Sequence, residues 1–250
     1  MEAIRPQIVD SEKVFDTAAS TNDIHLIQPA ADVGGVSAGE LKKLYDNRMA
    51  RAGSPGRDIY DKLMIAATND RCPLCGHRNV STLDHSLPKS RYPSLAVTPI
   101  NLVPCCSDCN KDKGSNVPQD RANAFLNAYY DDIEDDFWLF AEIVKSSPAG
   151  IRFFVKPHDG WDPVMSTRVQ NQFRELKLAK LYASQGGQQL LSMRGALEEI
   201  YQAAGADAVR TDLLRSYRSC IQVRVNSWQG SLYRAAAESD WYCGGGFALR

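Results

Sequence analysis

Two Cys-x-x-Cys pairs constrain the fold of this 250-residue chain more than any other feature of its sequence. Cys72 and Cys75 form the first pair, and Cys106 and Cys109 form the second. Two such pairs about thirty residues apart are typical of a structural zinc site, in which four thiolates surround the ion tetrahedrally. Cys105 directly precedes the second pair and leaves the third ligand ambiguous. Cys106 is favoured because it preserves the two-residue gap to Cys109.

An Asp-His step lies between the two pairs, in a segment that a zinc ion would hold rigid. Asp84 offers a hard oxygen ligand, and the His85 imidazole can accept a proton near neutral pH. Adjacent strand residues point to opposite faces, so these two share one site only where a strand ends or bends. Leu87-Pro88 supplies such an ending, because proline cannot continue a paired strand. Asn110 adds an oxygen ligand from the first turn of an expected helix.

These residue types indicate chemistry at a phosphodiester. Asp84 and Asn110 together suit one Mg²⁺ or Mn²⁺, with water and phosphate oxygens filling the remaining positions. His85 would be the general base that activates a water molecule for attack on phosphorus. The metal would polarise the phosphoryl oxygen and stabilise the departing 3′ oxygen.

The segment from Cys72 to Gly114 resembles the ββα-metal core of HNH endonucleases, in the zinc-bearing variant of that family. In this resemblance His85 matches the first histidine, the general base, and Asp84 matches the metal-binding residue before it. Asn101 matches the middle asparagine, whose family role is to hold the catalytic loop in shape. Asn110 matches the third position, where family members carry histidine or asparagine. Asparagine makes this ligand neutral and weaker, which leaves the choice of metal open.

With helical patterns on both sides, the resemblance predicts an α+β, mostly helical fold: a small ββα-metal core with a structural zinc knuckle, flanked by helices. We expect an N-terminal arm and helical buttress at residues 1–71 and the nuclease core at residues 72–117. A helical C-terminal region that binds DNA or a partner would occupy residues 118–250. The implied activity is a divalent-metal-dependent DNA endonuclease, with Zn²⁺ as the structural ion and Mg²⁺ or Mn²⁺ as the catalytic ion. Bacterial chains of this kind often belong to restriction, phage-defence or mobile-element systems, sometimes beside an ATPase subunit.

Two other functions fit parts of the same pattern. A non-catalytic zinc-stapled module that binds nucleic acid or scaffolds an assembly needs only the cysteines, so the Asp84-His85-Asn110 set counts against it. An RNase is the second alternative, because a ββα-metal site does not by itself tell the sugars apart. At the zinc site, His77 is a further competing ligand.

Composition and charge place the chain in a broad class. There is no apolar run near the 18 residues that a membrane span requires and no secretory signal, which predicts a cytoplasmic protein without membrane contact. The scattered Cys220 and Cys243 suit a reducing compartment. The net charge of −1 is not that of a simple DNA-binding domain. However, Asp and Glu predominate in residues 118–162, and Lys and Arg predominate in residues 163–237. The basic region would steer nucleic acid or dock an acidic partner. The alternative interpretation is that both regions are solvated helix faces.

Four basic residues lie near the proposed metal centre in sequence: Lys89, Arg91, Lys111 and Lys113. Lysine serves phosphate as a point charge, so this set predicts binding of a nucleic-acid backbone. For each single lysine, an exposed position without a contact is an equally good interpretation.

Periodicity and turn residues predict the elements of the N-terminal half. We expect an irregular arm over residues 1–36 with a short strand at 24–27, and a helix from Ser37, which with Glu40 forms a capping-box pattern. The core should contain a first strand, a second strand at one of two places, and a short helix. The expected ranges are 37–51 and 57–68 for the helices before the core, 80–84, then 95–97 or 102–103 for the strands, and 107–111 for the core helix.

The C-terminal half is predicted to be mostly helical. Helical signals dominate residues 119–145, and a short β-branched and aromatic stretch at residues 151–156 predicts a strand or hairpin. Three or four amphipathic helices should follow from about residue 162, with breaks at Gly186-Gly187 and Gly205.

Overall fold

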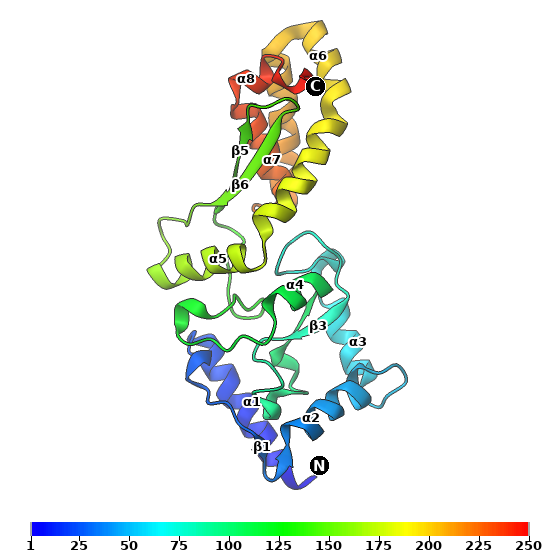
Figure 1. The fold of residues 1–250 in the computed structure, drawn as a ribbon, viewed down its shortest axis with the longest axis vertical. Coiled ribbons are helices and arrows are strands. Elements are labelled where there is room, and N and C mark those ends of the chain that lie inside the picture. Colours follow the sequence, from blue (N-terminus) through cyan, green and yellow to red (C-terminus); the bar gives the residue numbers. More distant parts are fainter. Residues whose placement is uncertain (1, 250) are drawn as a thin grey trace. The chain divides into compact units, whose positions relative to one another are not determined.

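The computed structural model describes residues 2–249 and divides into two compact units, which are described separately (Figure 1). The first unit comprises the chain up to Asp131 together with Pro163–Leu176, and the second comprises Asp132–Asp162 together with the chain from Lys177 onward. The architecture is α+β and mostly helical, as the sequence predicts, and its strands form two-stranded antiparallel sheets. Among residues 2–249, no helix combines the length and apolarity that crossing a membrane requires.

The N-terminal segment differs from the predicted irregular arm. Helix α1 (Arg5–Ser20) occupies most of it, and Ile24–Leu26 forms a 3-10 turn where a strand was expected. A proline at the start of α1 is tolerated because the first turn needs no N–H donor. The helix has no side-chain N-cap and buries only Phe15 and Ala19, so neither a capping signal nor a long apolar stripe marked it in the sequence.

The helix expected from Ser37 is confirmed. Helix α2 (Ala38–Tyr45) begins with a complete capping box, in which the Glu40 N–H donates to Ser37 Oγ at 3.3 Å and the Ser37 N–H donates to Glu40 Oε2 at 3.0 Å. A π-helical turn, Asp46–Ala50, continues it. The further elements before the core are the strands β1 (Asp32–Val33) and β2 (Val36–Ser37) and the helix α3 (Arg57–Ile65).

The core of the first unit is a ββα arrangement. Strand β3 (Thr82–His85) pairs antiparallel with β4 (Leu102–Cys105), with His85 opposite Leu102, and helix α4 (Ser107–Lys113) follows β4. Of the two places predicted for the second strand, the later one is therefore observed. The earlier place holds a 3-10 turn, Pro93–Leu95. His85 is the last residue of β3, so the proposed general base lies at the end of the strand.

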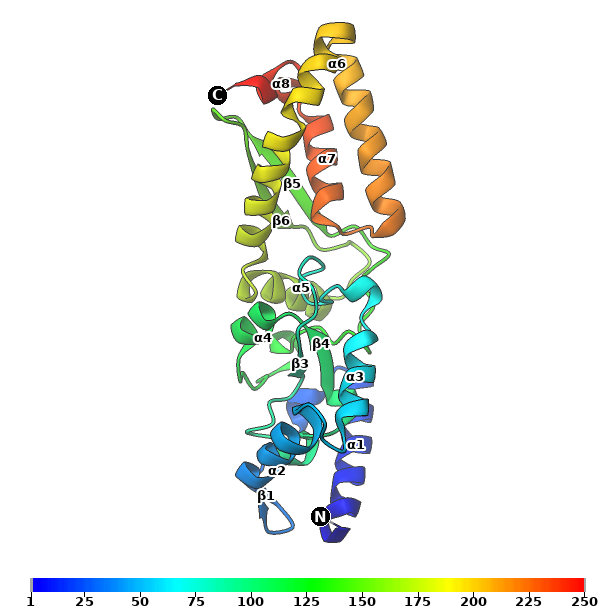
Figure 2. The ribbon, with the colours of Figure 1, turned by 90° about the vertical axis from the view of Figure 1, so that its right-hand side faces the viewer.

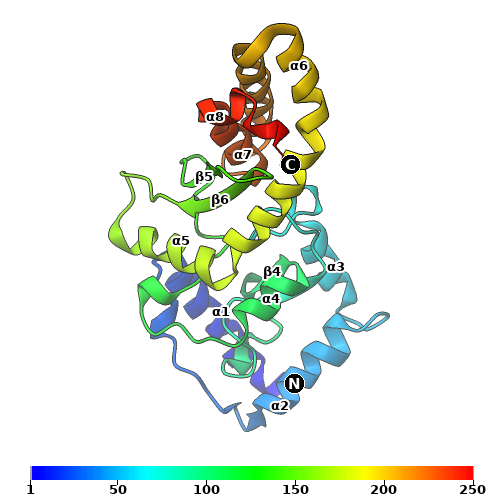
Figure 3. The ribbon, with the colours of Figure 1, turned by 45° about the horizontal axis from the view of Figure 1, so that its top comes forward.

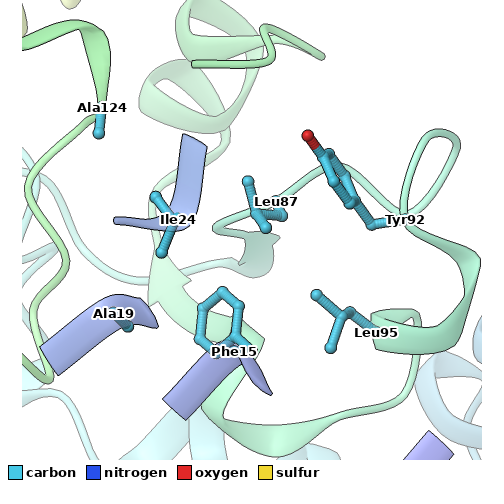
Figure 4. Packing of buried hydrophobic residues seen from close by; sticks show 7 residues of the cluster. All are labelled: Phe15, Ala19, Ile24, Leu87, Tyr92, Leu95 and Ala124. Atoms are coloured by element: carbon cyan, nitrogen blue, oxygen red, sulfur yellow. The ribbon is translucent and has the colours of Figure 1, made fainter. Parts of the chain in front are cut away.

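Two apolar clusters tie this core to the N-terminal elements. Figure 4 shows Phe15, Ala19 and Ile24 from the N-terminal segment facing Leu87, Tyr92 and Leu95 from the loop between β3 and β4, with Ala124 nearby. A second cluster packs side chains of α2, the π turn and α3 against the hairpin: Tyr45, Met49, Tyr60, Leu83 and Leu102. Burial of apolar side chains thus fixes both the loop and the hairpin that carry the candidate site.

A buried ion pair holds the segment that follows the core. Arg168 on helix α5 (Pro163–Glu175) pairs with Asp131, and both side chains are 3% exposed. The same guanidinium donates to the carbonyl oxygens of Ala124 and Phe125 at 3.1 and 3.0 Å. These bonds satisfy backbone groups in residues 119–131, where a helix was predicted and the structure has only a 3-10 turn, Arg121–Asn123, among irregular backbone.

The second unit is a β hairpin packed against helices. Strand β5 (Leu139–Val144) pairs with β6 (Gly150–Val155), so the strand predicted near residues 151–156 is confirmed as one half of a hairpin. The helix predicted over residues 119–145 is wrong here, because its last part is β5. The hairpin packs against α6 (Leu178–Val223) and α7 (Trp228–Glu238) (Figure 3), and a short helix α8 (Asp240–Cys243) follows.

The two predicted glycine breaks in α6 have different outcomes. The helix continues through Gly186-Gly187 without a break. A Cβ at Gly186 would lie 2.8 Å from Ile151 Cγ2 and 3.0 Å from Phe153 Cε2, so a larger residue would clash with β6. That glycine permits close packing of helix on strand. Gly205 is a true break, with a φ of 76°, and α6 consists of two arms that run in opposite directions (Figure 2).

Candidate metal and catalytic site

The structure brings Cys72, Cys75, Cys106 and Cys109 together in one buried cluster. Their sulfur atoms all lie within 4.8 Å of one another. A tetrahedral zinc ion with Zn–S distances of about 2.3 Å requires sulfur atoms roughly 3.8 Å apart, so the group could hold a zinc ion. Among the described residues this cluster includes Cys106 rather than Cys105, and it does not include His77.

Local backbone geometry presents the four thiols. Gly76 adopts a φ of 59°, and its N–H donates to Cys72 O at 2.7 Å, which closes the turn of the first pair. The Arg78 N–H points at Cys75 Sγ at 3.5 Å. Cys106 is the N-cap of α4, and its Sγ accepts from the Cys109 N–H at 3.4 Å. A helix N-terminus favours a thiolate, and N–H donors to sulfur orient metal ligands.

The crowded thiols cannot all ionise without a cation. Hydrogen bonding with Cys109 lowers the pKa of Cys106, and the same contact raises the pKa of Cys109. Hydrogen bonding with Cys106 likewise raises the pKa of Cys72. Ionisation of Cys106 is thus favoured by hydrogen bonding with Cys109 and Cys72, whose own pKa values are raised. A divalent ion would stabilise four thiolates at once, which is why a cluster of this kind couples zinc binding to folding.

Asp84 lies on β3 and is paired with a lysine. Lys113 Nζ is 2.9 Å from Asp84 Oδ2, and each of the two side chains is 5% exposed. The same ammonium donates to the backbone carbonyl of His85 at 2.7 Å. Burial raises the pKa of the Asp84 carboxyl, and the positive charge of Lys113 opposes that shift. Of the four basic residues expected to bind a nucleic-acid backbone, Lys113 is therefore buried and paired with Asp84 inside the core.

His85 is held as a neutral imidazole of one tautomer. Its Nε2 lies 2.9 Å from the carbonyl oxygen of Ala96, and because a carbonyl only accepts, Nε2 carries the proton. Nδ1 is then the unprotonated nitrogen. Burial lowers the pKa of His85 to about 3, and the Tyr45 ring packs edge-on against the imidazole with 4.6 Å between centroids. The side chain is thus oriented by one hydrogen bond and one aromatic contact.

Asn101 is fully buried and bridges the loop that follows β3. Its Oδ1 accepts from the Leu87 N–H at 2.7 Å, and its Nδ2 donates to the carbonyl oxygens of Leu87 and Leu95 at 3.0 and 3.1 Å. One amide side chain therefore satisfies three buried backbone groups on both sides of the loop.

Asn110 lies on α4, between the cysteine cluster and Lys113. It is partly exposed, and its backbone N–H donates to Cys106 O at 3.1 Å. The carboxylate of Asp84 and the amide oxygen of Asn110 are hard donors, which fits a hydrated Mg²⁺ or Mn²⁺ better than a soft ion. Asp84, however, is already paired with the positively charged Lys113, so Asp84, Asn110 and Lys113 together carry no net charge.

Sequence reasoning missed two contacts at the site: Lys113 on Asp84 and Tyr45 on His85. Periodicity held a signal for the first, because Lys113 follows Cys106 by seven residues and Cys109 by four, which places all three on one helix face. Of the other basic residues, Lys89 Nζ lies 3.1 Å from Asp46 Oδ1 and 3.9 Å from the Tyr45 ring centroid. Arg91 and Lys111 are exposed.

Comparisons with known proteins give two relatives. The chain is 27% identical to Protein ea31 of Escherichia phage lambda, over 94% of this chain and 86% of that protein. It is 31% identical to Septu protein PtuB of Bacillus thuringiensis over 37% of this chain, a match that spans 38% of the relative. No family model matches the chain, and no solved structure matches it significantly. The chain thus has a relative of similar length in a phage and a partial relative in a bacterium.

Proposed function

We propose that this chain is a divalent-metal-dependent endonuclease of the HNH type that hydrolyses phosphodiester bonds of DNA. The observation that carries the proposal is the 2.9 Å contact between His85 Nε2 and Ala96 O, because a carbonyl there requires the proton on Nε2 and leaves Nδ1 as an acceptor. A general base needs such an unprotonated nitrogen in a fixed orientation. Asp84 is its neighbour at the end of β3, and Asn110 lies on the helix that packs against this strand.

Each side chain then has a defined task. His85 Nδ1 takes a proton from the attacking water, while Ala96 O and the Tyr45 ring hold the imidazole in place. Asp84 and Asn110 would hold Mg²⁺ or Mn²⁺, which supplies Lewis-acid stabilisation of the phosphoryl and leaving oxygens. Asn101 keeps the loop after His85 closed on itself through its three hydrogen bonds. A zinc ion held by Cys72, Cys75, Cys106 and Cys109 would take no part in the reaction and would stabilise the fold of the core.

Residues 72–117 are the proposed nuclease core, with residues 1–71 as its buttress. The packing of Phe15 on the loop and of Tyr45 on the hairpin supports the second role. For residues 118–250 we propose binding of DNA or of a protein partner such as an ATPase subunit. For the biological setting we propose restriction, phage defence or a mobile element, and the relative encoded by phage lambda fits the last of these.

The deciding experiment incubates zinc-loaded protein with supercoiled plasmid in Mg²⁺, Mn²⁺ or EDTA, for the wild type and His85→Ala. We expect nicking or cleavage with either ion, none in EDTA, and a loss of at least about a hundredfold in His85→Ala, the scale of a lost general base. His158→Ala is the matched control, because His158 is exposed and lies in the other unit. Zinc content should be equal in all three proteins.

Each contrary result has a defined meaning. Cleavage by His85→Ala at the wild-type rate would remove His85 as the base. Hydrolysis of RNA but not DNA would select the RNase alternative. Binding of nucleic acid without cleavage in any metal would select the non-catalytic zinc module.

A further inference from the structure

Lys113 is the one basic side chain of α4 that points into the core. It is the last residue of the helix and is 5% exposed, whereas Lys111 of the same helix is exposed. Its ammonium lies 2.9 Å from Asp84 Oδ2, 2.7 Å from His85 O and 5.9 Å from the centre of the Phe125 ring. A lysine this deeply buried is held by its partners. It has two oxygen acceptors and an aromatic neighbour.

Without a metal ion, the side chains of Asp84, Lys113, His85 and Asn110 together carry a net charge of about zero. The carboxylate contributes one negative charge and Lys113 one positive charge, while the His85 imidazole and the Asn110 amide are neutral. Hard divalent ions are held mainly by anionic oxygens, and their affinity follows the number of ligand charges. At Asp84 a divalent ion meets one carboxylate whose charge is already compensated, and it also meets the repulsion of the nearby ammonium.

We propose that Lys113 positions Asp84 and couples metal loading to nucleic acid. The ammonium engages Oδ2 and the His85 carbonyl, so it fixes the carboxylate relative to the general base. A phosphodiester brought to the site adds the negative charge that Lys113 has cancelled, and a phosphate oxygen completes the ligand shell. The metal ion and the nucleic acid therefore bind together, and each raises the affinity of the protein for the other. This inference rests on the proposed function, because it assumes that the ion binds at Asp84.

Coupling of this kind is reciprocal. If a duplex raises the affinity for the ion by some factor, the ion must raise the affinity for the duplex by the same factor. A metal that loads only with its phosphodiester also leaves the free protein without a Lewis acid beside a general base. The structure thus assigns Lys113 a role in the timing of metal binding as well as in the geometry of Asp84.

The test measures Mn²⁺ affinity by electron paramagnetic resonance on zinc-loaded protein, with and without a phosphorothioate duplex that resists cleavage. The wild type should bind Mn²⁺ at least about tenfold more tightly when the duplex is present. Lys113→Gln keeps a donor for the His85 carbonyl but removes the charge, so without duplex it should bind Mn²⁺ at least about tenfold more tightly than the wild type. Lys113→Arg keeps the charge and should keep the coupling.

Lys111→Gln is the control, because it removes the same charge from the same helix at an exposed position. Its Mn²⁺ affinity without duplex should equal that of the wild type. An equal gain in Lys111→Gln and Lys113→Gln would reduce the effect to net charge and overturn the inference. If Lys113→Gln loses zinc and does not fold, Lys113→Arg decides, and loss of coupling in that variant overturns the inference.

Asp84→Asn separates this inference from the function beneath it. Loss of Mn²⁺ binding in Asp84→Asn, with unchanged affinity in Lys113→Gln, would overturn the role of Lys113 and leave the metal site in place. Mn²⁺ binding that survives Asp84→Asn would place the ion elsewhere and overturn both the inference and the proposed catalytic site.

Discussion

The two ends of the short helix α4 contribute to two contrasting candidate metal sites, the cysteine cluster and the proposed site at Asp84. Its first turn holds Cys106 and Cys109, which complete a cluster of four soft sulfur donors. Its last residue, Lys113, places a positive charge 2.9 Å from the Asp84 carboxylate of the proposed second site. The first arrangement needs a cation to stabilise its thiolates, whereas the second is already compensated without one. A structural zinc ion would thus be part of the fold, whereas we propose that the catalytic ion binds together with nucleic acid.

The chemistry of the donors sharpens the same contrast. Thiolates select zinc, and a carboxylate with an amide oxygen suits a hydrated Mg²⁺ or Mn²⁺. We therefore expect the two sites to select different ions, even though one helix of seven residues contributes to both. A zinc ion at the cysteine cluster would fix α4, and α4 sets the position from which Lys113 reaches Asp84 on β3.

The largest expected effect follows from breaking the zinc site. Cys106→Ser should lose the zinc ion and the folded core with it, because structural zinc contributes on the order of 10 kcal/mol in small metal-dependent folds. Zinc content by elemental analysis and a thermal melt by circular dichroism measure both outcomes. Cys105→Ser is the matched control and should keep one zinc per chain. A Cys106→Ser protein with full zinc and wild-type stability would contradict the ligand set.

A smaller effect is expected from the loop between the two strands. Asn101→Ala removes three hydrogen bonds and leaves the backbone N–H and carbonyl of Leu87 without their partner, so the free energy of unfolding should fall by about 2–4 kcal/mol. Urea unfolding measures it. Zinc content should not change, because the loop lies outside the cysteine cluster, and cleavage should fall as the loop loosens.

The control for that loop is Asn116→Ala, which changes an exposed asparagine shortly after α4. Its stability should match the wild type within about 0.5 kcal/mol. An Asn101→Ala protein as stable as Asn116→Ala would show that the three hydrogen bonds do not hold the loop.

The smallest effect should come from the neutral ligand of the catalytic site. Asn110→Ala should raise the half-saturating metal concentration for plasmid nicking several-fold, and Asn110→Asp should lower it, because the first removes an oxygen ligand and the second adds a charge. Mn²⁺ should support faster cleavage than Mg²⁺, and zinc content should stay at the wild-type level. Identical metal titrations for the wild type and Asn110→Ala would show that Asn110 is not a ligand.

The parts that could be predicted from the sequence are those set by near neighbours in the chain. The capping box of Ser37 and Glu40 spans three residues, and each cysteine pair spans three more. The strand that ends at His85 was marked by the proline shortly after it. In contrast, α1 has no side-chain cap, and β5 becomes a strand because β6 supplies its hydrogen bonds. Tertiary pairing overrode the helical pattern there.

By itself the sequence determined which chemistry is present: four thiols at zinc spacing, an Asp-His step and an asparagine after the second pair. Only the tertiary structure decided which partners orient and charge-balance these residues. Lys113 meets the carbonyl of a residue 28 positions earlier, and His85 Nε2 finds the carbonyl of Ala96 across the loop. Such contacts depend on the closure of the ββα core on its four-cysteine cluster and on the packing of Phe15 against Leu87. No local propensity encodes them, because each partner becomes a neighbour only when the apolar clusters are buried.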